Sequence, residues 1–249
     1  MWETEDKNIE IRCIGGETVT VAAIIPAAGM GRRLGVGYNK QYIDLLDKPM
    51  VVRTIETISN NELISEVIWV VGDGEIEQAR RLADEYKLLK VTNIIVGGKE
   101  RIHSVINGFR VVSEQAEYLF IHDGARPLVT QEIIDRCIRQ AMTTGAAIAA
   151  VPVKDTIKIV DNDEQLIQST PIRSTLWAAQ TPQIIKKKWF EEAIAELFSV
   201  DELSKVTDDS MLMEMTNRPV SISLGSYENI KVTTTEDVKL AELILKGRQ

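Results

Sequence analysis

Cysteine and histidine are scarce in this 249-residue chain, which contains two residues of each type. Cys13 and Cys137 lie far apart and belong to no C-x-x-C motif, which disfavours a disulfide framework or a structural zinc site and favours a reducing compartment, the cytoplasm. His103 and His122 form neither H-x-x-x-H nor H-E-x-x-H, which disfavours a zinc hydrolase. We expect His122 to order the loop around Asp123 rather than to act as a catalytic base.

The sequence also lacks a membrane-spanning segment and a surplus of positive charge. No apolar run reaches the roughly 18 residues that span a bilayer, and the acidic residues 1–12 lack the apolar core of a signal peptide. The net charge is −8, because 37 acidic residues outnumber 29 basic ones. Such a chain is not expected to bind nucleic acid through bulk charge. An anionic substrate must therefore be held by a local basic cluster.

Short apolar runs rich in Val and Ile alternate with amphipathic stretches over the first 150 residues. The apolar runs predict buried strands at residues 19–25, 67–71, 91–96, 118–121 and 146–151. The amphipathic stretches predict helices at residues 50–58, 76–86, 101–112 and 131–143. Pro49 suits the first helical position and Thr130 suits an N-cap. This alternation predicts an α/β fold with a mostly parallel sheet covered on both faces, and with ligands at the carboxyl ends of the strands.

The alternation of apolar runs with amphipathic stretches ends after Val151. Residues 152–173 are polar and extended, and the tip Asp161-Asn162-Asp163 separates two stretches that can pair as a hairpin. We interpret this segment as a projecting β-arm, with an ordinary surface hairpin as the alternative. Helices are expected again at residues 186–198 and 236–245, and a strand at 220–224. Because no repeat or linker divides the chain, we expect an N-terminal extension at 1–20 and a single domain at 21–249.

The segment 26–41, PAAGMGRRLGVGYNKQ, directly follows the first predicted strand and carries local positive charge. Residues 18–43 contain no Asp or Glu but contain three basic residues, Arg32, Arg33 and Lys40. Small residues let backbone N–H groups approach a ligand closely, and such amides together with Arg and Lys side chains make a phosphate cradle. The alternative is a glycine-rich turn with solvated charges. The motifs G-x-G-x-x-G and G-x-x-x-x-G-K-[ST] are both absent, which disfavours a nicotinamide dehydrogenase and a P-loop nucleotidase.

Two further motifs follow predicted strands. GGKERIHS, residues 97–104, opens a helix and places Arg101 and Ser104 one helical turn apart, so that a base or phosphate could sit there; a plain strand-to-helix turn is the alternative. IHDGARP, residues 121–127, places Asp123 at the end of a strand. A single carboxylate there suits a Mg²⁺ that is also bound by substrate phosphates, whereas the alternative is that Asp123 only caps a turn.

The later part of the chain contributes weaker signals. Lys231 lies within an apolar, strand-like stretch, where a lysine is either an exposed edge residue or a buried charge with an anionic partner. No serine occupies G-x-S-x-G, so the nucleophile elbow of the α/β-hydrolases is absent. Taken alone, none of these segments identifies a function.

Seven motifs in order carry a family resemblance: PAAGMGRR…NKQY, GGKERIHS, HDGARP, PVKDTIK, LWAAQTPQ, VTDDS and NIKVTTTED. Together they resemble the 2-C-methyl-D-erythritol 4-phosphate cytidylyltransferases over residues 21–245. The resemblance implies a three-layer, Rossmann-like nucleotidyltransferase fold and transfer of CMP from CTP to methylerythritol 4-phosphate, with Mg²⁺, in isoprenoid synthesis. It also implies a homodimer interlocked by the arm. Ribitol-5-phosphate cytidylyltransferase, another sugar-phosphate nucleotidyltransferase and a non-catalytic nucleotide sensor remain alternatives.

The resemblance also implies roles for individual residues. Arg33 and Lys40 match a pair that stabilises the transition state, and Lys231 matches a lysine near the α-phosphate. Asp123 matches the metal side of the site. The residues that match nucleotide-binding positions, or lie beside them, are Ala27, Ala28, Gly29, Gly98, Lys99, Arg101, Ser104, Asp123, Gly124 and Arg126. Thr156 and Arg173 match arm residues that hold the sugar phosphate in the neighbouring subunit's active site, and Thr207 matches a further substrate contact.

Overall fold

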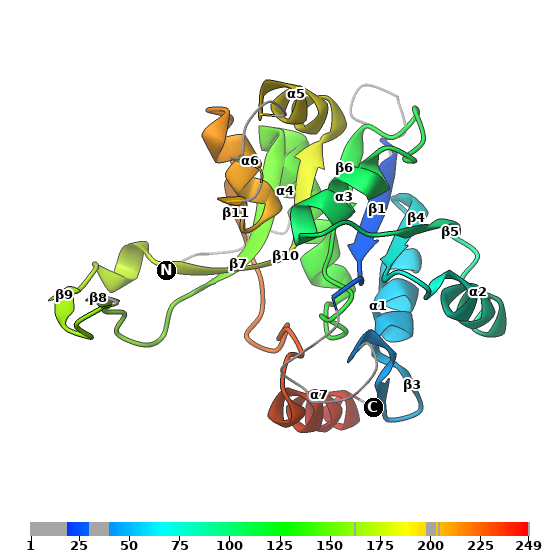
Figure 1. Ribbon diagram of the computed structural model, residues 1–249, viewed down its shortest axis with the longest axis horizontal. Helices are drawn as coiled ribbons and strands as arrows, with labels where there is room; N and C mark the ends of the chain where they lie inside the picture. Colours follow the sequence, from blue (N-terminus) through cyan, green and yellow to red (C-terminus); the bar gives the residue numbers. More distant parts are fainter. Residues whose placement is uncertain (1–18, 30–39, 162, 198–202, 204, 249) are drawn as a thin grey trace.

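A seven-stranded sheet forms the centre of the molecule (Figure 1). The computed structural model describes residues 19–29, 40–161, 163–197, 203 and 205–248. The strand order is β11-β7-β10-β6-β1-β4-β5, and only β10 runs antiparallel to its neighbours. The strands are β1 (Val21–Pro26), β4 (Ile64–Val71), β5 (Val91–Val96), β6 (Tyr118–Ile121), β7 (Ala146–Pro152), β10 (Trp177–Lys186) and β11 (Ser221–Leu224). The predicted α/β fold with a mostly parallel sheet is confirmed.

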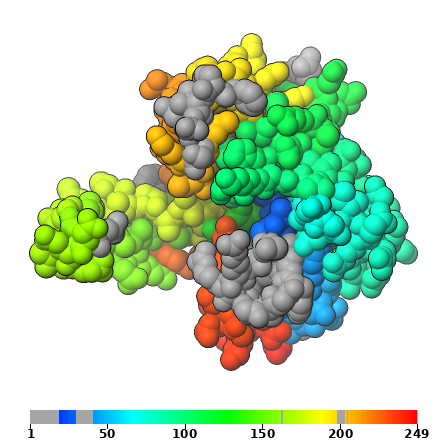
Figure 2. All heavy atoms as spheres, in the orientation of Figure 1, coloured from blue at the N-terminus to red at the C-terminus, as the bar shows by residue number. Residues whose placement is uncertain are grey.

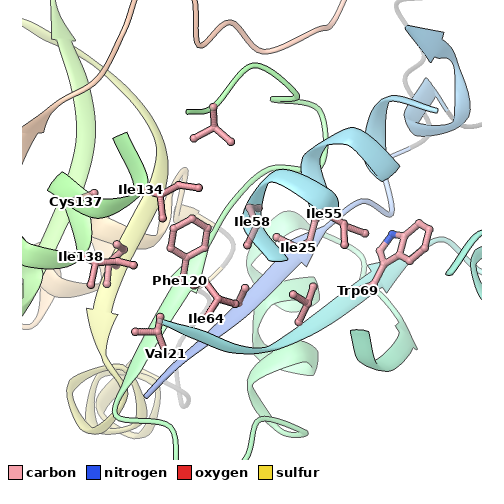
Figure 3. Close-up of a cluster of buried hydrophobic side chains, with 14 of the residues drawn as sticks. Val21, Ile25, Ile55, Ile58, Ile64, Trp69, Phe120, Ile134, Cys137 and Ile138 are labelled. Carbon is pink, nitrogen blue, oxygen red and sulfur yellow. The ribbon is translucent and has the colours of Figure 1, made fainter. Parts of the chain in front are cut away.

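Helices cover both faces of this sheet, because the buried strands present apolar side chains to both sides. On one face, Val21 and Ile25 of β1 pack with α1 (Met50–Ser59) and α4 (Gln131–Thr144), a cluster drawn in Figure 3. On the other face, Ile24 packs with α3 (Arg101–Phe109), α5 (Lys187–Leu197) and α6 (Asp209–Met215). The helix α2 (Ile76–Glu85) lies against β5, and α7 (Thr235–Gly247) packs near the short pair β2 (Asp44–Leu45) and β3 (Lys48–Pro49).

Several local predictions need correction. Pro49 is the N-cap of α1, with φ −55° and ψ 139°, rather than its first helical residue. Thr130 does cap α4, since its side chain accepts a hydrogen bond from the Ile133 N–H. Lys231 lies in a loop and not in a strand, because residues 225–234 connect β11 to α7 without sheet pairing. The strand β10 and the helix α6 were not predicted. Pro182, which supplies no N–H to a ladder, interrupts the apolar pattern of β10, and the register shifts between Ala179 and Gln183.

The segment between β7 and β10 extends away from the sheet, as Figures 1 and 2 show. Within it, β8 (Ile159–Val160) pairs antiparallel with β9 (Ile167–Ser169), which confirms the predicted hairpin; the short 3-10 helix η3 (Arg173–Thr175) follows. Both strands are exposed along their whole length. Within the described residues, no helix has the length and apolar character needed to cross a membrane.

Candidate active site

A cleft of about 460 Å³ opens at the carboxyl ends of β1, β5 and β6, where a parallel sheet is expected to bind its ligand. The loops after these three strands supply most of its wall, and the loop before α7 closes another side. The lining residues are Pro26, Ala28, Gly29, Gln41, Gly98, Lys99, Glu100, Arg101, Ser104, Asp123, Ala125, Lys231 and Thr233. Eight of the residues proposed from the sequence therefore meet in one cavity.

The carboxylate of Asp123 is the electrostatic centre of this cleft. Lys231 Nζ lies 2.7 Å from its Oδ2, Arg101 Nε lies 3.0 Å from its Oδ1, and Arg126 Nε lies 4.0 Å from Oδ2. Burial alone would raise the pKa of Asp123, but the neighbouring Arg101 and Lys231 outweigh it and hold that pKa well below its usual range. Asp123 is thus ionised and serves as more than a turn cap. It gathers the basic cluster that an anionic substrate requires in an acidic chain.

Arg101 joins Asp123 to a second carboxylate that the sequence did not single out. Nη2 of Arg101 lies 2.7 Å from Oδ2 of Asp209. Asp209 is the first residue of α6 and is completely buried. Burial would lower the pKa of Arg101, but Asp209 and Asp123 raise it above its usual value. Burial raises the pKa of Asp209 itself. In the sequence Asp208 and Asp209 are indistinguishable candidates for a helix cap, and Asp208 is the residue that caps α6.

The loop that carries Asp123 is held from behind by His122. His122 is completely buried; its Nε2 lies 3.1 Å from the Arg126 carbonyl oxygen and its Nδ1 3.1 Å from Thr181 Oγ1. Burial lowers the pKa of His122 to about 4, so the ring is neutral at pH 7. The carbonyl can only accept, so we assign the proton to Nε2, and the Thr181 hydroxyl donates to Nδ1. That same hydroxyl oxygen accepts from the Asp123 N–H at 3.1 Å, so His122 orders the Asp123 loop as expected.

Lys231 is placed by a loop fastened on both sides. Asn229 Nδ2 donates to the Thr181 carbonyl at 2.9 Å, and the Asn229 carbonyl accepts from Arg126 Nη1 at 2.7 Å. The Val232 N–H donates to the Ala125 carbonyl at 2.8 Å. The Lys231 side chain, which is 41% exposed, therefore reaches the cleft, where its ammonium forms an ion pair with the Asp123 carboxylate. It combines the two alternatives left open by the sequence, because it is partly exposed and has an anionic partner.

The loop between β5 and α3, which begins with Gly97 and Gly98, leaves no room for a side chain at either glycine. A Cβ on Gly97 would lie 2.7 Å from both Ala28 Cβ and Ser104 Oγ. Ser104 Oγ accepts from the Gly98 N–H at 3.0 Å and donates to the Glu100 carbonyl at 3.4 Å. Ser104 therefore shapes the loop that lines the cleft. Because this loop packs closely against Ala28, position 97 accommodates only glycine.

The remaining predicted residues do not line the cleft. Ala27 and Gly124 pack behind it, since a Cβ on Gly124 would lie 3.2 Å from Ala27 Cβ. Thr207 is found with its hydroxyl 3.8 Å from Met211 Sδ. Arg126 lies next to the cleft, where its Nη1 donates a hydrogen bond to the Asn229 carbonyl.

The arm carries Thr156 and Arg173, which are both exposed. Arg173 Nη1 donates to the Lys154 carbonyl at 3.1 Å. Arg33 and the side chain of Lys40 lie outside the described residues.

Comparison with known proteins identifies the family. A sequence model of the 2-C-methyl-D-erythritol 4-phosphate cytidylyltransferases matches residues 21–247. The chain belongs to the 2-C-methyl-D-erythritol 4-phosphate cytidylyltransferase family. It is 47% identical to the protein of that name from Alkaliphilus oremlandii over 92% of this chain and 96% of the relative. The corresponding protein from Geobacter metallireducens is 42% identical over 92% of this chain and 99% of its own length.

The fold comparison agrees with the sequence comparison. A crystal structure of 4-diphosphocytidyl-2C-methyl-D-erythritol synthase from Anaerococcus prevotii matches with a TM-score of 0.80 and 31% identity, covering 92% of this chain and 96% of that one. The resemblance drawn from seven motifs is thereby confirmed, as is the Rossmann-like nucleotidyltransferase fold. Membership in the cytidylyltransferase family favours the methylerythritol 4-phosphate assignment over the ribitol-phosphate alternative.

Proposed function

We propose that this chain transfers CMP from CTP to the phosphate of 2-C-methyl-D-erythritol 4-phosphate, with release of pyrophosphate, in isoprenoid precursor synthesis. Family membership over residues 21–247 supports the reaction. The observation that carries it in the structure is the basic cluster at the carboxyl end of the sheet. Three cations, Arg101, Arg126 and Lys231, meet there around Asp123 in a chain whose net charge is −8.

The chemistry suits a site without a catalytic base. The attacking group is a phosphate monoester, which is already mostly dianionic at neutral pH. One of its oxygens forms a bond to the α-phosphorus of CTP, and the bond from that phosphorus to the pyrophosphate oxygen breaks. The obstacle is repulsion between two polyanions, so catalysis consists mainly of positioning and charge stabilisation. A buried, neutral His122 is consistent with this requirement.

The described residues divide this work between them. Gly98, Lys99 and Ser104 line the cleft, and the family resemblance assigns them to the loop that recognises cytosine. Ala28 and Gly29 also line it, and the resemblance assigns them to the loop that wraps the nucleotide. Lys231, exposed at the cleft, is the described cation best placed to meet the α-phosphate. An arriving phosphate would compete with Asp123 for the Lys231 ammonium. Arg33 and Lys40 remain predicted partners in transition-state stabilisation.

The cleft offers a Mg²⁺ ion one carboxylate ligand, so the ion would also have to be bound by the substrate phosphates. Among the described residues no group of three or more His, Cys, Asp or Glu side chains could hold a metal by itself. A Mg²⁺ ion that is coordinated mainly by substrate phosphates needs only one or two protein carboxylates. Asp123 is an ionised carboxylate in the cleft wall. We propose Asp123 as that ligand. When bound, the ion would neutralise charge on the triphosphate.

A homodimer is the assembly that we propose for the arm. Two-stranded hairpins are marginally stable alone, and this one exposes six large apolar side chains, Ile157, Ile159, Val160, Leu166, Ile167 and Ile172. A second copy of the chain would cover them. Because Thr156 and Arg173 do not line the cleft of their own subunit, we propose that they serve the partner's cleft. The scarcity of cysteine supports a cytoplasmic enzyme. The net charge of −8 supports action on small anions rather than on nucleic acid.

The deciding experiment is pyrophosphate release from CTP and Mg²⁺, with methylerythritol 4-phosphate compared with ribitol 5-phosphate. We expect turnover with the first and little with the second. Preference for ribitol 5-phosphate would keep the nucleotide site and change the acceptor. Absence of release with either acceptor would contradict the proposed function.

A further inference from the structure

The guanidinium of Arg101 divides one hydrogen-bonding edge between two carboxylates. Its Nε donates to Oδ1 of Asp123 at 3.0 Å, and its Nη2 donates to Oδ2 of Asp209 at 2.7 Å. These two nitrogens form one of the two edges with which arginine can make parallel bonds to a single carboxylate. Asp209 therefore occupies the position that the second oxygen of Asp123 would otherwise take.

The division of this edge determines what remains for Lys231. Because Arg101 gives Asp123 one bond through Oδ1, the other oxygen, Oδ2, is available to the Lys231 ammonium at 2.7 Å. If Arg101 bound both oxygens of Asp123, it would compete directly with Lys231 for Oδ2. Oδ2 would then be shared between two cationic donors, which would weaken its bond to Lys231 and displace the ammonium.

Asp209 is well suited to such a task and to little else. It is completely buried on α6, its Oδ2 bonds Arg101, and its Oδ1 has no hydrogen-bond partner among the described residues. A buried charge costs free energy unless it is paired, and here the pairing is with one nitrogen of Arg101. The neighbouring Asp208 performs the structural work, since it accepts from the Met211 N–H at 3.1 Å and from Gln183 Nε2 at 2.9 Å.

We infer that Asp209 is a positioning residue of the transfer reaction: by holding Nη2 of Arg101 it restricts Arg101 to one oxygen of Asp123 and leaves the other to Lys231. This inference rests on the proposed function for its consequence in turnover. The geometric part, the choice of partners made by Arg101, can be tested without any activity.

The kinetic test uses Asp209→Ala, which removes both side-chain oxygens and so leaves Nη2 of Arg101 without this acceptor. We expect kcat to fall about tenfold with the KM for CTP within about twofold, because the loss is an indirect displacement of one transition-state donor. Asp84→Ala, at an exposed aspartate on α2, is the matched control and should keep near-normal kcat. Thermal unfolding of both variants shows whether they fold.

A double-mutant cycle separates positioning from a general structural role. If Asp209 acts through Arg101, adding Asp209→Ala to Arg101→Gln should lower kcat by less than about twofold further. Independent, multiplying effects would overturn the inference. So would an Asp209→Ala variant with a lowered melting temperature and unchanged kcat.

The crystal structure of Asp209→Ala provides the readout that does not depend on turnover. We expect both Nε and Nη2 of Arg101 on the carboxylate of Asp123, and Lys231 moved away from Oδ2. An unchanged Arg101 with a single bond to Asp123 would overturn the inference even in an active enzyme. Conversely, a rearranged Arg101 in a protein that releases no pyrophosphate would uphold the positioning and count only against the proposed function.

Discussion

Tyr227 donates its hydroxyl hydrogen to the carbonyl oxygen of Pro152 at 2.7 Å. Pro152 ends β7, where the arm leaves the sheet, whereas Tyr227 lies in the loop that continues to Lys231. Lys154 Nζ also lies 3.5 Å from the centroid of the Tyr227 ring, a close cation–π contact. The base of the arm is thus fastened to the loop that serves the subunit's own cleft.

Removing this hydroxyl should loosen the base of the arm. A single neutral hydrogen bond contributes about 1 kcal/mol, so Tyr227→Phe should speed amide exchange at the arm base roughly fivefold. Hydrogen exchange measured by mass spectrometry over residues 152–176 provides the test. Tyr86→Phe, at the end of α2, is the matched control and should leave exchange in the arm unchanged. Equal exchange in the two variants would show that the bond does not hold the arm.

Lys231→Ala tests the cation that Asp123 places at the cleft. Removal of one donor to the charge that develops in the transition state should lower kcat by about 10²–10³-fold. The fold should persist, because the Lys231 side chain is 41% exposed and its loop is held by Asn229 and Val232 backbone contacts. Pyrophosphate release and thermal unfolding together measure both effects. Lys239→Ala, an exposed lysine on α7, should behave as wild type. Turnover within a few-fold of wild type in Lys231→Ala would remove Lys231 from the mechanism.

The burial of His122 predicts a pH dependence of stability. Its pKa is lowered by burial from 6.5 to about 4, so between these values the unfolded chain binds a proton that the folded chain excludes. The stabilisation is therefore complete above pH 6.5 and is lost as the pH falls toward 4, by at most roughly 3 kcal/mol.

Urea unfolding at pH 7 and pH 5 measures this loss. His122→Gln retains an N–H that can reach the Arg126 carbonyl but cannot titrate, so the difference between wild type and variant isolates the histidine from the carboxylates. The wild type should lose more free energy of unfolding between the two pH values than the variant. Parallel losses in both proteins would show that His122 is not the group responsible.

The fold was predictable from the sequence wherever a strand or helix has a local hydrophobic pattern. The site was predictable wherever its residues directly follow a predicted strand. The run 91–96 is short and rich in Val and Ile, so β5 was predictable as a strand. Its predicted burial was wrong, because β5 is an edge strand of the sheet and none of its residues is fully buried. β10 escaped prediction because Pro182 argues against a strand, while the partners that complete it, β6 and β7, come from elsewhere in the chain. Asp123 was identifiable from its place after an apolar run. Asp209 was not, because its partner Arg101 is 108 residues away and nothing in the sequence tells which of two adjacent aspartates is buried.

Complementation between subunits tests the shared site. In a dimer whose arms are exchanged, each cleft takes Lys231 from one subunit and Arg173 from the other. Arg173→Ala and Lys231→Ala homodimers should each be nearly inactive. A mixed dimer then contains one cleft with both mutations and one cleft with neither.

Mixing equal amounts of the two variants under conditions of subunit exchange should restore about a quarter of wild-type activity, because half the dimers are mixed and each has one intact cleft. Differently tagged subunits, purified through both tags, establish that exchange has occurred. If the arm served its own subunit instead, every cleft in the mixture would carry one mutation and no activity would return. Recovery on mixing therefore distinguishes an arm that completes the partner's cleft from an arm that only holds the dimer together.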